Sequence, residues 1–366
     1  MKLSTRLSLA ATLLALASCQ KKEDTIKIGL SGVQSGPDAA IGAAPVNGSK
    51  LAIEEWNAKG GVLGKRIEIV VRDDEGKPKT ATAVAQELVS AGVVAVVGHF
   101  NSGCSIPASE VYDQAGIVQI TPASTNPQLT ERGFKNTFRI CGRDDQQGVV
   151  SAAFARDTLK TQVIAVLNDK TSYGQGIAEV FKKTFEGKGG KVAVFEGVGA
   201  DEKDFRGAVA SIQKSGATAV YWAGMFVQGG IFYNQLREAG FKGALVGGDG
   251  LFDDEFHKTT QGRADSVFLT FGPDYKAKPE AQAFLAKYRK SFGPEGSYSI
   301  YGYDAANVLL SAIQKAGSTD AKAISAAFRG QAWKTLGGEV SFDAKGDLKA
   351  AGYVIWTARG GKFVAR

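Results

Sequence analysis

Short apolar runs alternate with longer amphipathic stretches from residue 26 to about residue 270. The apolar runs predict strands at 26–30, 66–71, 93–97, 117–120, 163–167, 191–195, 218–222, 244–246 and 266–270. Most of these runs are unbroken rather than alternating, which is typical of strands buried on both faces of a parallel sheet. The stretches between them predict helices, including 46–58, 80–91, 176–186, 204–215 and 229–239. Strict alternation of strand and helix therefore predicts an α/β fold whose parallel sheets are covered by helices.

The distribution of these units along the chain predicts two sheets. Four or five strand and helix units precede residue 142 and four follow it, and a chain of 366 residues exceeds what one hydrophobic core usually serves. Past residue 272 the pattern changes to helices at 279–290, 301–316 and 320–328, then strands at 339–342, 353–356 and 362–364. This tail is too small and too helical for a third domain. We expect it to return and complete the two earlier ones.

The amino-terminal segment differs from the rest of the chain in composition. Lys2 and Arg6 precede an apolar stretch at 7–17, which is too short to span a bilayer and suits the core of a signal peptide. The stretch ends in Leu-Ala-Ser-Cys at 16–19, which resembles a bacterial lipobox whose cysteine becomes lipidated. We therefore expect a signal peptide at 1–18, a lipidated tether at 19–25 attached through Cys19, and export to the periplasmic or cell-surface side of a membrane. An ordinary secretory signal, in which Cys19 is incidental, is the alternative.

The charge and the chemistry-bearing residues exclude several classes of function. The 44 Lys and Arg residues are interspersed with 37 Asp and Glu residues, and no basic stripe predicts a nucleic-acid partner. Two histidines, His99 and His257, are too few for a histidine-rich metal site, and we expect His99 to be packed and hydrogen-bonded. The chain has no G-x-S-x-G motif, P-loop or complete dinucleotide fingerprint. We therefore predict a protein without catalytic activity, cofactor or metal.

Two further groups of residues have structural interpretations. The acidic run at 73–75 follows a strand and is expected to form a solvated turn that caps the next helix, in preference to a cation site. Cys104 and Cys141 are compatible with a disulfide in an oxidising compartment and equally with small buried side chains.

Small polar residues follow two of the predicted strands, where open α/β sheets bind ligands. The segment 98–103 (GHFNSG) opens a helix, so the Ser102 hydroxyl and adjacent amides would face an anion at the positive helix end. The segment 121–126 (TPASTN) adds hydroxyls after the next strand. Together they predict a carboxylate site, although each segment alone also fits a helix cap or a turn.

Several motifs, taken in order, resemble one family across nearly the whole chain after the signal peptide. They are 28–37 (IGLSGVQSGP), 57–65 (NAKGGVLGK), 97–102 (VGHFNS), 120–125 (ITPAST), 138–139 (FR), 144–148 (DDQQG), 173–176 (YGQG), 203–205 (KDF), 248–250 (GDG) and 343–348 (DAKGDL). This order resembles the branched-chain amino-acid-binding proteins of ABC transporters. The resemblance implies a type I periplasmic-binding-protein fold, with two Rossmann-like lobes joined by three hinge crossovers. It places the first lobe at 26–142 with a return at 272–352, and the second at 143–271 with a return at 353–366.

The resemblance also implies a ligand-binding set. Ser102, Ala123 and Thr125, with Ser124 between them, match the positions that hold the ligand's α-carboxylate and part of its ammonium group from the first lobe. Tyr173 and Asp249 match second-lobe positions at the ligand, with Asp249 against the ammonium group. A zwitterion needs partners for both charges once it is dehydrated, so this set is chemically coherent.

The sequence departs from the family at several of these positions. Met225, followed by Phe226, stands where a tyrosine is common, and Ile41 stands where an aromatic residue often touches the ligand. Gly76 and Asn101 replace a disulfide-forming cysteine pair. Tyr301 is expected either to line the cavity or to pack in the core, as is Tyr303. These changes indicate an altered pocket for the ligand's side chain.

The resemblance implies a monomeric substrate-binding protein that delivers an aliphatic amino acid, with Leu, Ile or Val as the first candidates, to ABC permease subunits. The same fold binding another small amide or organic acid, or acting as a ligand-sensing module, is the alternative.

Overall fold

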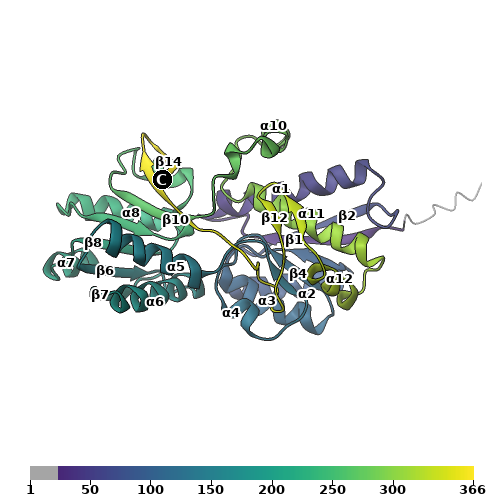
Figure 1. Ribbon diagram of the computed structural model, residues 1–366, viewed down its shortest axis with the longest axis horizontal. Coiled ribbons are helices and arrows are strands. Elements are labelled where there is room, and N and C mark those ends of the chain that lie inside the picture. Colours follow the sequence, from purple (N-terminus) through teal and green to yellow (C-terminus); the bar gives the residue numbers. More distant parts are fainter. Residues whose placement is uncertain (1–23) are drawn as a thin grey trace, which may run out of the picture.

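The structure is a computed structural model that describes residues 24–366. The expected signal peptide and Cys19 lie outside these residues. The described chain forms two lobes side by side, each built on its own sheet (Figure 1). The expected α/β fold with two lobes and parallel sheets is therefore confirmed. Among residues 24–366, none of the helices has both the length and the apolarity that crossing a bilayer requires.

The first lobe contains a five-stranded sheet in the order β2-β1-β3-β4-β5, and every neighbouring pair in it is parallel. Its strands are β1 (Ile26–Gly32), β2 (Ile67–Asp73), β3 (Ala95–Val97), β4 (Val118–Thr121) and β5 (Thr137–Arg139). The helices around it and in the returning tail are α1 (Ala39–Ala58), α2 (Pro78–Ser90), α3 (Ser102–Gln114), α4 (Gln128–Glu131), α10 (Pro279–Phe292), α11 (Ser299–Ala316) and α12 (Ala321–Arg329), with the 3-10 turn η3 (Tyr275–Ala277). A small hairpin, β11 (Trp333–Thr335) and β12 (Gly338–Val340), follows α12.

The second lobe contains a seven-stranded sheet in the order β14-β13-β10-β9-β8-β6-β7. Its strands are β6 (Val163–Asn168), β7 (Lys191–Gly197), β8 (Ala219–Ala223), β9 (Ala244–Gly247), β10 (Val267–Phe271), β13 (Val354–Arg359) and β14 (Lys362–Ala365). Its helical segments are α5 (Asp144–Ala153), η1 (Phe154–Thr158), α6 (Ser172–Gly187), α7 (Arg206–Lys214), α8 (Phe226–Glu238), η2 (Asp249–Leu251) and α9 (Asp254–Thr259). The strands from β6 to β10 are parallel, whereas β13 pairs antiparallel with β10 and β14 pairs antiparallel with β13.

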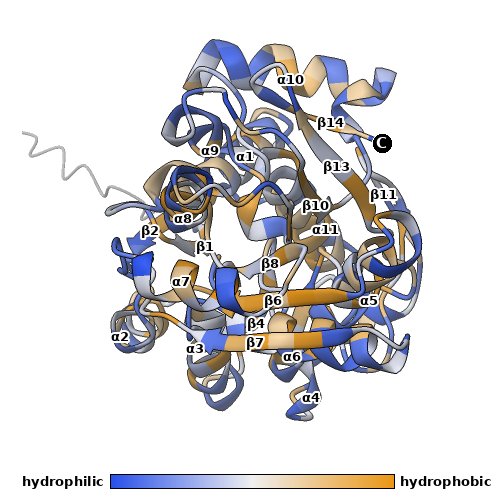
Figure 2. Cartoon of the chain, turned by 90° about the vertical axis from the view of Figure 1, so that its left-hand side faces the viewer, coloured by the Kyte–Doolittle hydropathy of each residue, from blue (hydrophilic) through white to orange (hydrophobic). Residues whose placement is uncertain are grey.

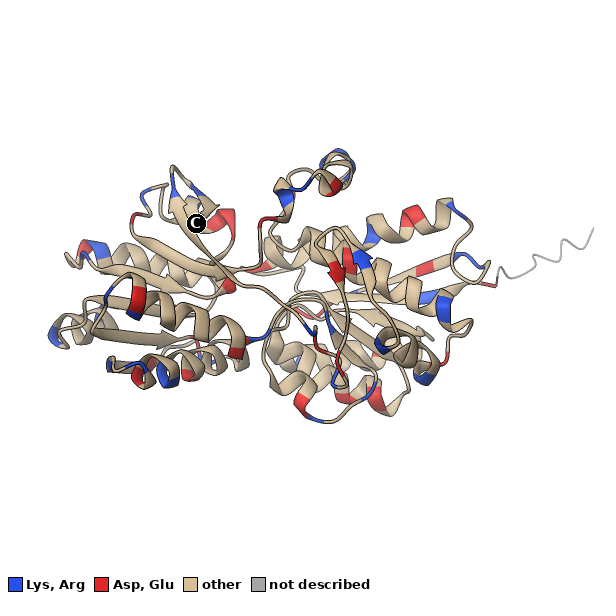
Figure 3. Cartoon of the chain, viewed as in Figure 1, with Lys and Arg blue, Asp and Glu red and all other residues tan. Residues whose placement is uncertain are grey.

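Burial of these strands agrees with their apolar sequences. All five residues of β8 and all three of β3 are buried, as are five of the six residues of β6, which is largely orange in the hydropathy colouring (Figure 2). The edge strand β7 is apolar as well, but its residues are only partly buried or exposed. Charged residues of both signs are spread over both lobes rather than gathered on one face (Figure 3). The hydrophobic effect therefore fixes two separate sheet cores, while the surface charge has no direct part in the fold.

The returning tail packs against the start of the chain through two glycines. A Cβ atom added to Gly48 in α1 would lie 2.1 Å from the Ser299 carbonyl oxygen, and one added to Gly302 in α11 would lie 2.0 Å from the Pro45 carbonyl oxygen. The Ser49 hydroxyl donates to the Gly302 carbonyl across the same contact at 2.9 Å. Because only glycine permits this approach, α11 lies tightly on α1 and the tail completes the first lobe.

The crossovers between the lobes lie close together. A Cβ atom on Gly142, between β5 and α5, would lie 2.4 Å from the Tyr353 ring, just before β13. The Trp356 indole donates to the Gly272 carbonyl, just after β10, at 3.0 Å. The exact residues at which the chain changes lobe stay a prediction.

A buried ion pair ties the last crossover to the first lobe. The Arg139 guanidinium, at the end of β5, is fully buried and contacts Asp347 at 2.5 Å, and Arg143 contacts the other oxygen of that carboxylate at 2.5 Å. Burial by itself raises the pKa of Asp347, but the charges of the two arginines outweigh it and hold that pKa below its usual value.

We predict that Asp347→Ala lowers the free energy of unfolding by about 3–5 kcal/mol, because it leaves the buried Arg139 without its carboxylate partner. The exposed pair Arg206–Asp204 provides the control, and Asp204→Ala should change stability little. Since the folded pKa of Asp347 is depressed, its contribution is present above about pH 4 and is lost as the pH falls below that value. Urea unfolding at pH 7 and pH 3 measures both effects. Equal losses for the two variants at pH 7 would contradict the role given to Asp347.

Candidate functional site

A cavity of about 700 Å³ lies between the lobes at the carboxyl ends of their parallel strands. From the first lobe it is lined by residues after β1, β2, β3 and β4, and from the second by residues after β6, β7, β8 and β9. The lobes touch across it, because the Asn126 side-chain amide donates to the Ser172 carbonyl at 2.5 Å and the Ser297 hydroxyl donates to the Phe252 carbonyl. The structure therefore shows a closed cleft, in which the two lobes are in contact and both form walls of the cavity.

The first-lobe wall carries the amino-terminal end of α3. Ser102 and Gly103 line the cavity, and they lie in the first turn of α3, where the helix dipole is positive and main-chain amides have no acceptor within the helix. Ser102 is 2% exposed, and its hydroxyl accepts a hydrogen bond from the main-chain amide of Asn126 at 3.2 Å, which fixes the position of the hydroxyl. This end of the cavity is suited to a carboxylate.

The second-lobe wall carries Asp249, which lies directly after β9 and is 4% exposed. Its Oδ1 accepts hydrogen bonds from the Gln147 side-chain amide and the Tyr173 hydroxyl, each at 2.8 Å. Its Oδ2 accepts one from the Tyr298 hydroxyl at 2.6 Å. Tyr298 precedes α11 and thus belongs to the first lobe, so the carboxylate of one lobe is held by a donor from the other.

The state of charge of Asp249 depends on its buried neighbour Asp144. Burial, followed by the charge of Asp249, raises the pKa of Asp144 to about 8, so Asp144 keeps its proton at neutral pH. Burial also raises the pKa of Asp249 above its usual value, and the three hydrogen-bond donors around it offset only part of that rise. Because its donors favour the ionised form, Asp249 is the member of this pair that carries the negative charge. It can therefore accept an ammonium group in a dehydrated site.

The structure brings together only part of the expected ligand-binding set. Ser102, Ala123, Tyr173, Met225 and Asp249 line the cavity. Ser124 and Thr125 are buried behind the wall, where the Ser124 hydroxyl donates to the Phe100 carbonyl at 2.8 Å and the Thr125 carbonyl accepts from the Asp144 amide at 2.9 Å. Their roles at the ligand stay a prediction.

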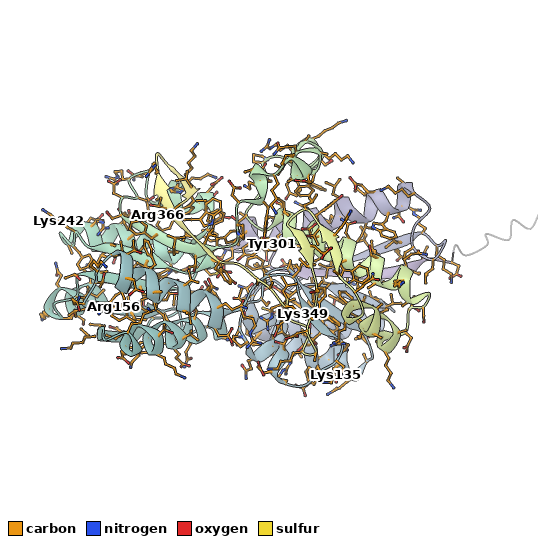
Figure 4. The ribbon with its side chains drawn as sticks, in the orientation of Figure 1. Lys135, Arg156, Lys242, Tyr301, Lys349 and Arg366 are labelled. Carbon is orange, nitrogen blue, oxygen red and sulfur yellow. The ribbon has the colours of Figure 1, made fainter. Side chains whose placement is uncertain are left out.

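The remaining expected residues are not among those that line this cavity, and their roles at the ligand stay a prediction. Ile41 and Phe226 are fully buried in a hydrophobic cluster. Tyr301 lies near the junction of the lobes (Figure 4) and lines a second cavity of about 600 Å³, whose walls also come from both lobes. Tyr303 donates from its hydroxyl to Glu55 at 2.7 Å. Neither tyrosine lines the cleft cavity.

Cavity-lining residues that the sequence analysis did not single out include Asp38, Asp169, Asp201, Gln228 and Tyr298. Asp169 lies two residues after the end of the predicted strand at 163–167, so its position after a strand was a usable signal. Tyr298 has no such signal, because it reaches the cavity from the turn before a helix of the returning tail.

The acidic turn and the cysteines also differ in part from expectation. Asp74 is not solvated but fully buried, and it contacts His99 Nδ1 at 2.6 Å. The His99 Nε2 atom lies 3.0 Å from the Tyr112 hydroxyl, so this histidine is packed and hydrogen-bonded as expected. Cys104 and Cys141 are both buried free thiols.

Comparison with known proteins gives consistent matches over the described chain. A family model described as periplasmic binding protein matches residues 25–362. The Leu/Ile/Val-binding protein homolog 1 of Brucella suis is 40% identical over 333 residues, which cover 90% of each chain. The leucine-, isoleucine-, valine-, threonine-, and alanine-binding protein of Pseudomonas aeruginosa is 36% identical over 353 residues, covering 96% of this chain and 95% of that protein.

Solved structures match in the same way. The leucine-binding protein LivK of Thermotoga maritima superposes with a TM-score of 0.87 at 27% identity, covering 93% of this chain and 97% of the other. The branched-chain amino acid transporter substrate-binding protein LivJ of Streptococcus pneumoniae, in complex with isoleucine, gives a TM-score of 0.84 at 27% identity, covering 93% of this chain and 100% of the other.

We predict that Asp249→Asn weakens the binding of an amino acid roughly thirtyfold to several thousandfold, because removing one partner of a dehydrated charge pair typically costs 2–5 kcal/mol. Asp144→Asn is the matched control, since Asp144 is already neutral at pH 7, and its loss should be much smaller. An analogue of the ligand without its amino group should bind Asp249→Asn and the wild-type protein about equally. Calorimetric titration measures each affinity, and unchanged binding of the amino acid by Asp249→Asn would refute the assignment.

Proposed function

The chain belongs to the periplasmic binding protein family, and on that premise we propose that it is the extracytoplasmic substrate-binding protein of an ABC importer. It captures an L-α-amino acid between its lobes and delivers it to the permease subunits. The observation that carries this proposal is the position of Asp249, in the cavity wall opposite the amino-terminal end of α3 and hydrogen-bonded by Tyr298 from the other lobe. The helix end is suited to the carboxylate of a ligand and Asp249 to its ammonium group, so the two sites together match a zwitterion.

Binding and closure are linked in this proposal. A ligand stabilises the closed cleft only through contacts that it makes with both lobes in that state. The carboxylate end of the cavity belongs to the first lobe and Asp249 to the second, so an amino acid bridges them. The released ligand then passes to the permease when the lobes separate about the crossovers. Each wall of the cavity comes from the same chain, which is consistent with action as a monomer.

The names of the relatives make Leu, Ile and Val the first ligands to test. Val33, Phe100 and Met225 supply apolar lining to the cavity, which supports an amino acid with an aliphatic stem. No catalytic step is proposed, since the family is one of binding proteins for transport.

A thermal-shift screen of the purified protein against the amino acids tests the proposal directly. A ligand with micromolar affinity, present at millimolar concentration, stabilises the folded state by about 4 kcal/mol through mass action. We expect at least one L-α-amino acid to raise the melting temperature, and its D-enantiomer to have a much smaller effect. If no amino acid shifts the melting temperature while a small amide or organic acid does, the proposed ligand class is wrong.

Attachment to a membrane through a lipid on Cys19 is part of the proposal. We predict that Cys19→Ala leaves the protein either in the soluble exported fraction or as an uncleaved precursor, because acyl chains contribute about 0.8 kcal/mol per buried methylene and the polar tether offers no substitute. Membrane fractionation and the size of the processed protein provide the readout. Normal processing with unchanged membrane association would show that Cys19 is not the anchor.

A further inference from the structure

The cleft cavity has a second acidic region, distinct from the one around Asp249. Asp38, just before α1 in the first lobe, lines it together with Asp169 and Asp201 of the second lobe. We call these three residues the distal carboxylates. Burial, followed by the charges of Asp169, Asp253 and Asp201, raises the pKa of Asp38 to about 6. Burial also raises the pKa of Asp169 to about 6.

The sheet order fixes the separation of the two acidic regions. Asp249 follows β9 and Asp169 follows β6, and the parallel strand β8 lies between these two strands. Neighbouring strands are about 4.8 Å apart, so the main chain at Asp169 and the main chain at Asp249 are separated by roughly 10 Å along the same sheet edge. A compact amino acid whose ammonium group contacts Asp249 would extend its side chain toward Asp169.

Asp38 has no structural role that would account for a carboxylate at this place. It occupies the N-cap position of α1, yet its side chain makes no capping hydrogen bond. Its Oδ1 atom is buried and has no hydrogen-bond partner among the described residues. A buried acceptor in this state is costly, and the cost is removed when a ligand supplies the donor.

Asp169 lines the cavity and is held by its own loop through one carboxylate oxygen. Its Oδ1 accepts from the Thr171 amide at 2.9 Å and from the Thr171 hydroxyl at 2.6 Å. The residue is 3% exposed, and its Oδ2 lies beside Gly224, where an added Cβ atom would be 3.1 Å away. The loop geometry is thus complete with Oδ1 alone, and Oδ2 can accept from a ligand.

Within residues 24–366, the lysines that line the cavity do not neutralise these carboxylates by direct contact. Lys77 contacts Glu75 at 2.7 Å, and Lys170 is exposed. Nor do three or more His, Cys, Asp or Glu side chains of the described chain converge as ligands of a metal ion. An organic cation between Asp38 and Asp169 would supply the direct ionic contact that these lysines do not make.

We propose that this cavity selects an α-amino acid whose side chain ends in a cation, such as ornithine or lysine, and that Asp38 and Asp169 hold this cation from opposite lobes. The inference rests on the proposed function, and it replaces the aliphatic ligand expected from the relatives. A neutral side chain leaves like charges facing each other across the closed cleft, whereas a cation between them favours closure.

Lysine and norleucine are the matched ligands for the test, because norleucine has the same carbon chain without the terminal amino group. Calorimetric titration of the purified protein at pH 7.5 and low salt should give an affinity for lysine or ornithine at least tenfold higher than for norleucine, leucine, isoleucine or valine. Asp38→Asn should reduce this preference tenfold or more, chiefly by lowering the affinity for lysine or ornithine. Asp254→Asn removes a negative charge from an exposed position at the start of α9 and should leave the preference unchanged.

The outcomes separate this inference from the proposed function. Tight binding of leucine, isoleucine or valine with no gain for lysine or ornithine would overturn the inference and leave the proposed function standing. The absence of binding by every amino acid would overturn both. A preference for lysine that Asp38→Asn does not reduce would overturn the role of Asp38, provided that thermal unfolding shows the variant folded. Asp38→Ala, which also removes the hydrogen-bonding group, should lower the affinity for lysine at least as much as Asp38→Asn does.

Discussion

The site depends on one interaction between the lobes: the second lobe supplies a dehydrated carboxylate, and the first lobe supplies a hydrogen bond to it. An ionised carboxylate in a closed cleft is unfavourable unless donors surround it. Asp249 has two donors from its own lobe, Gln147 and Tyr173, and a third, Tyr298, from the first lobe. The third is available only in a conformation where the lobes touch. Closure and the ionised state of Asp249 therefore support each other, and a ligand's ammonium group adds to the same balance.

The fold holds the third donor in place through contacts far from the cavity. Tyr298 precedes α11, and α11 is fixed on α1 by the close approach at Gly48 and Gly302. The buried Arg139–Asp347 pair then secures the segment that leads the chain back to the second sheet. The tail residues after 272 thus serve two functions, since they complete the first lobe and bring a tyrosine to the carboxylate of the second.

Local sequence patterns predicted the strands well because burial on both faces leaves a run of apolar residues that needs no knowledge of the partner strand. Ser102 could be named for a similar reason, since polar residues that follow strands of a parallel sheet meet at one edge, whereas Asp249 was named only through the resemblance to the family. The start of α1 was missed by several residues, because 39–45 is rich in alanine and glycine and includes Pro45. Ile41 and Phe226 were named through the resemblance to the family. Both are fully buried in a hydrophobic cluster that also includes cavity-lining residues, so their place at the ligand stays a prediction. Tyr298 and Asp38 could not be found in this way, because their place at the cavity results from the packing of segments remote in sequence.

The charges at the two ends of the cavity have different relations to closure. Around Asp249 the lobes meet through a hydrogen bond, so closing the cleft is favourable there before any ligand is considered. At the distal carboxylates the lobes bring together acidic groups, Asp38 from one side and Asp169 and Asp201 from the other, so closing is unfavourable there. One contact in this cleft therefore favours closure and the other opposes it. The equilibrium between open and closed forms is then set by the group that neutralises the distal carboxylates. Selectivity then arises from repulsion toward unsuitable ligands as much as from attraction toward the correct one. Under this proposal the chemistry of the ligand's side chain is coupled to the motion of the lobes, while the amino and carboxylate groups of the proposed amino acid supply the common part of recognition.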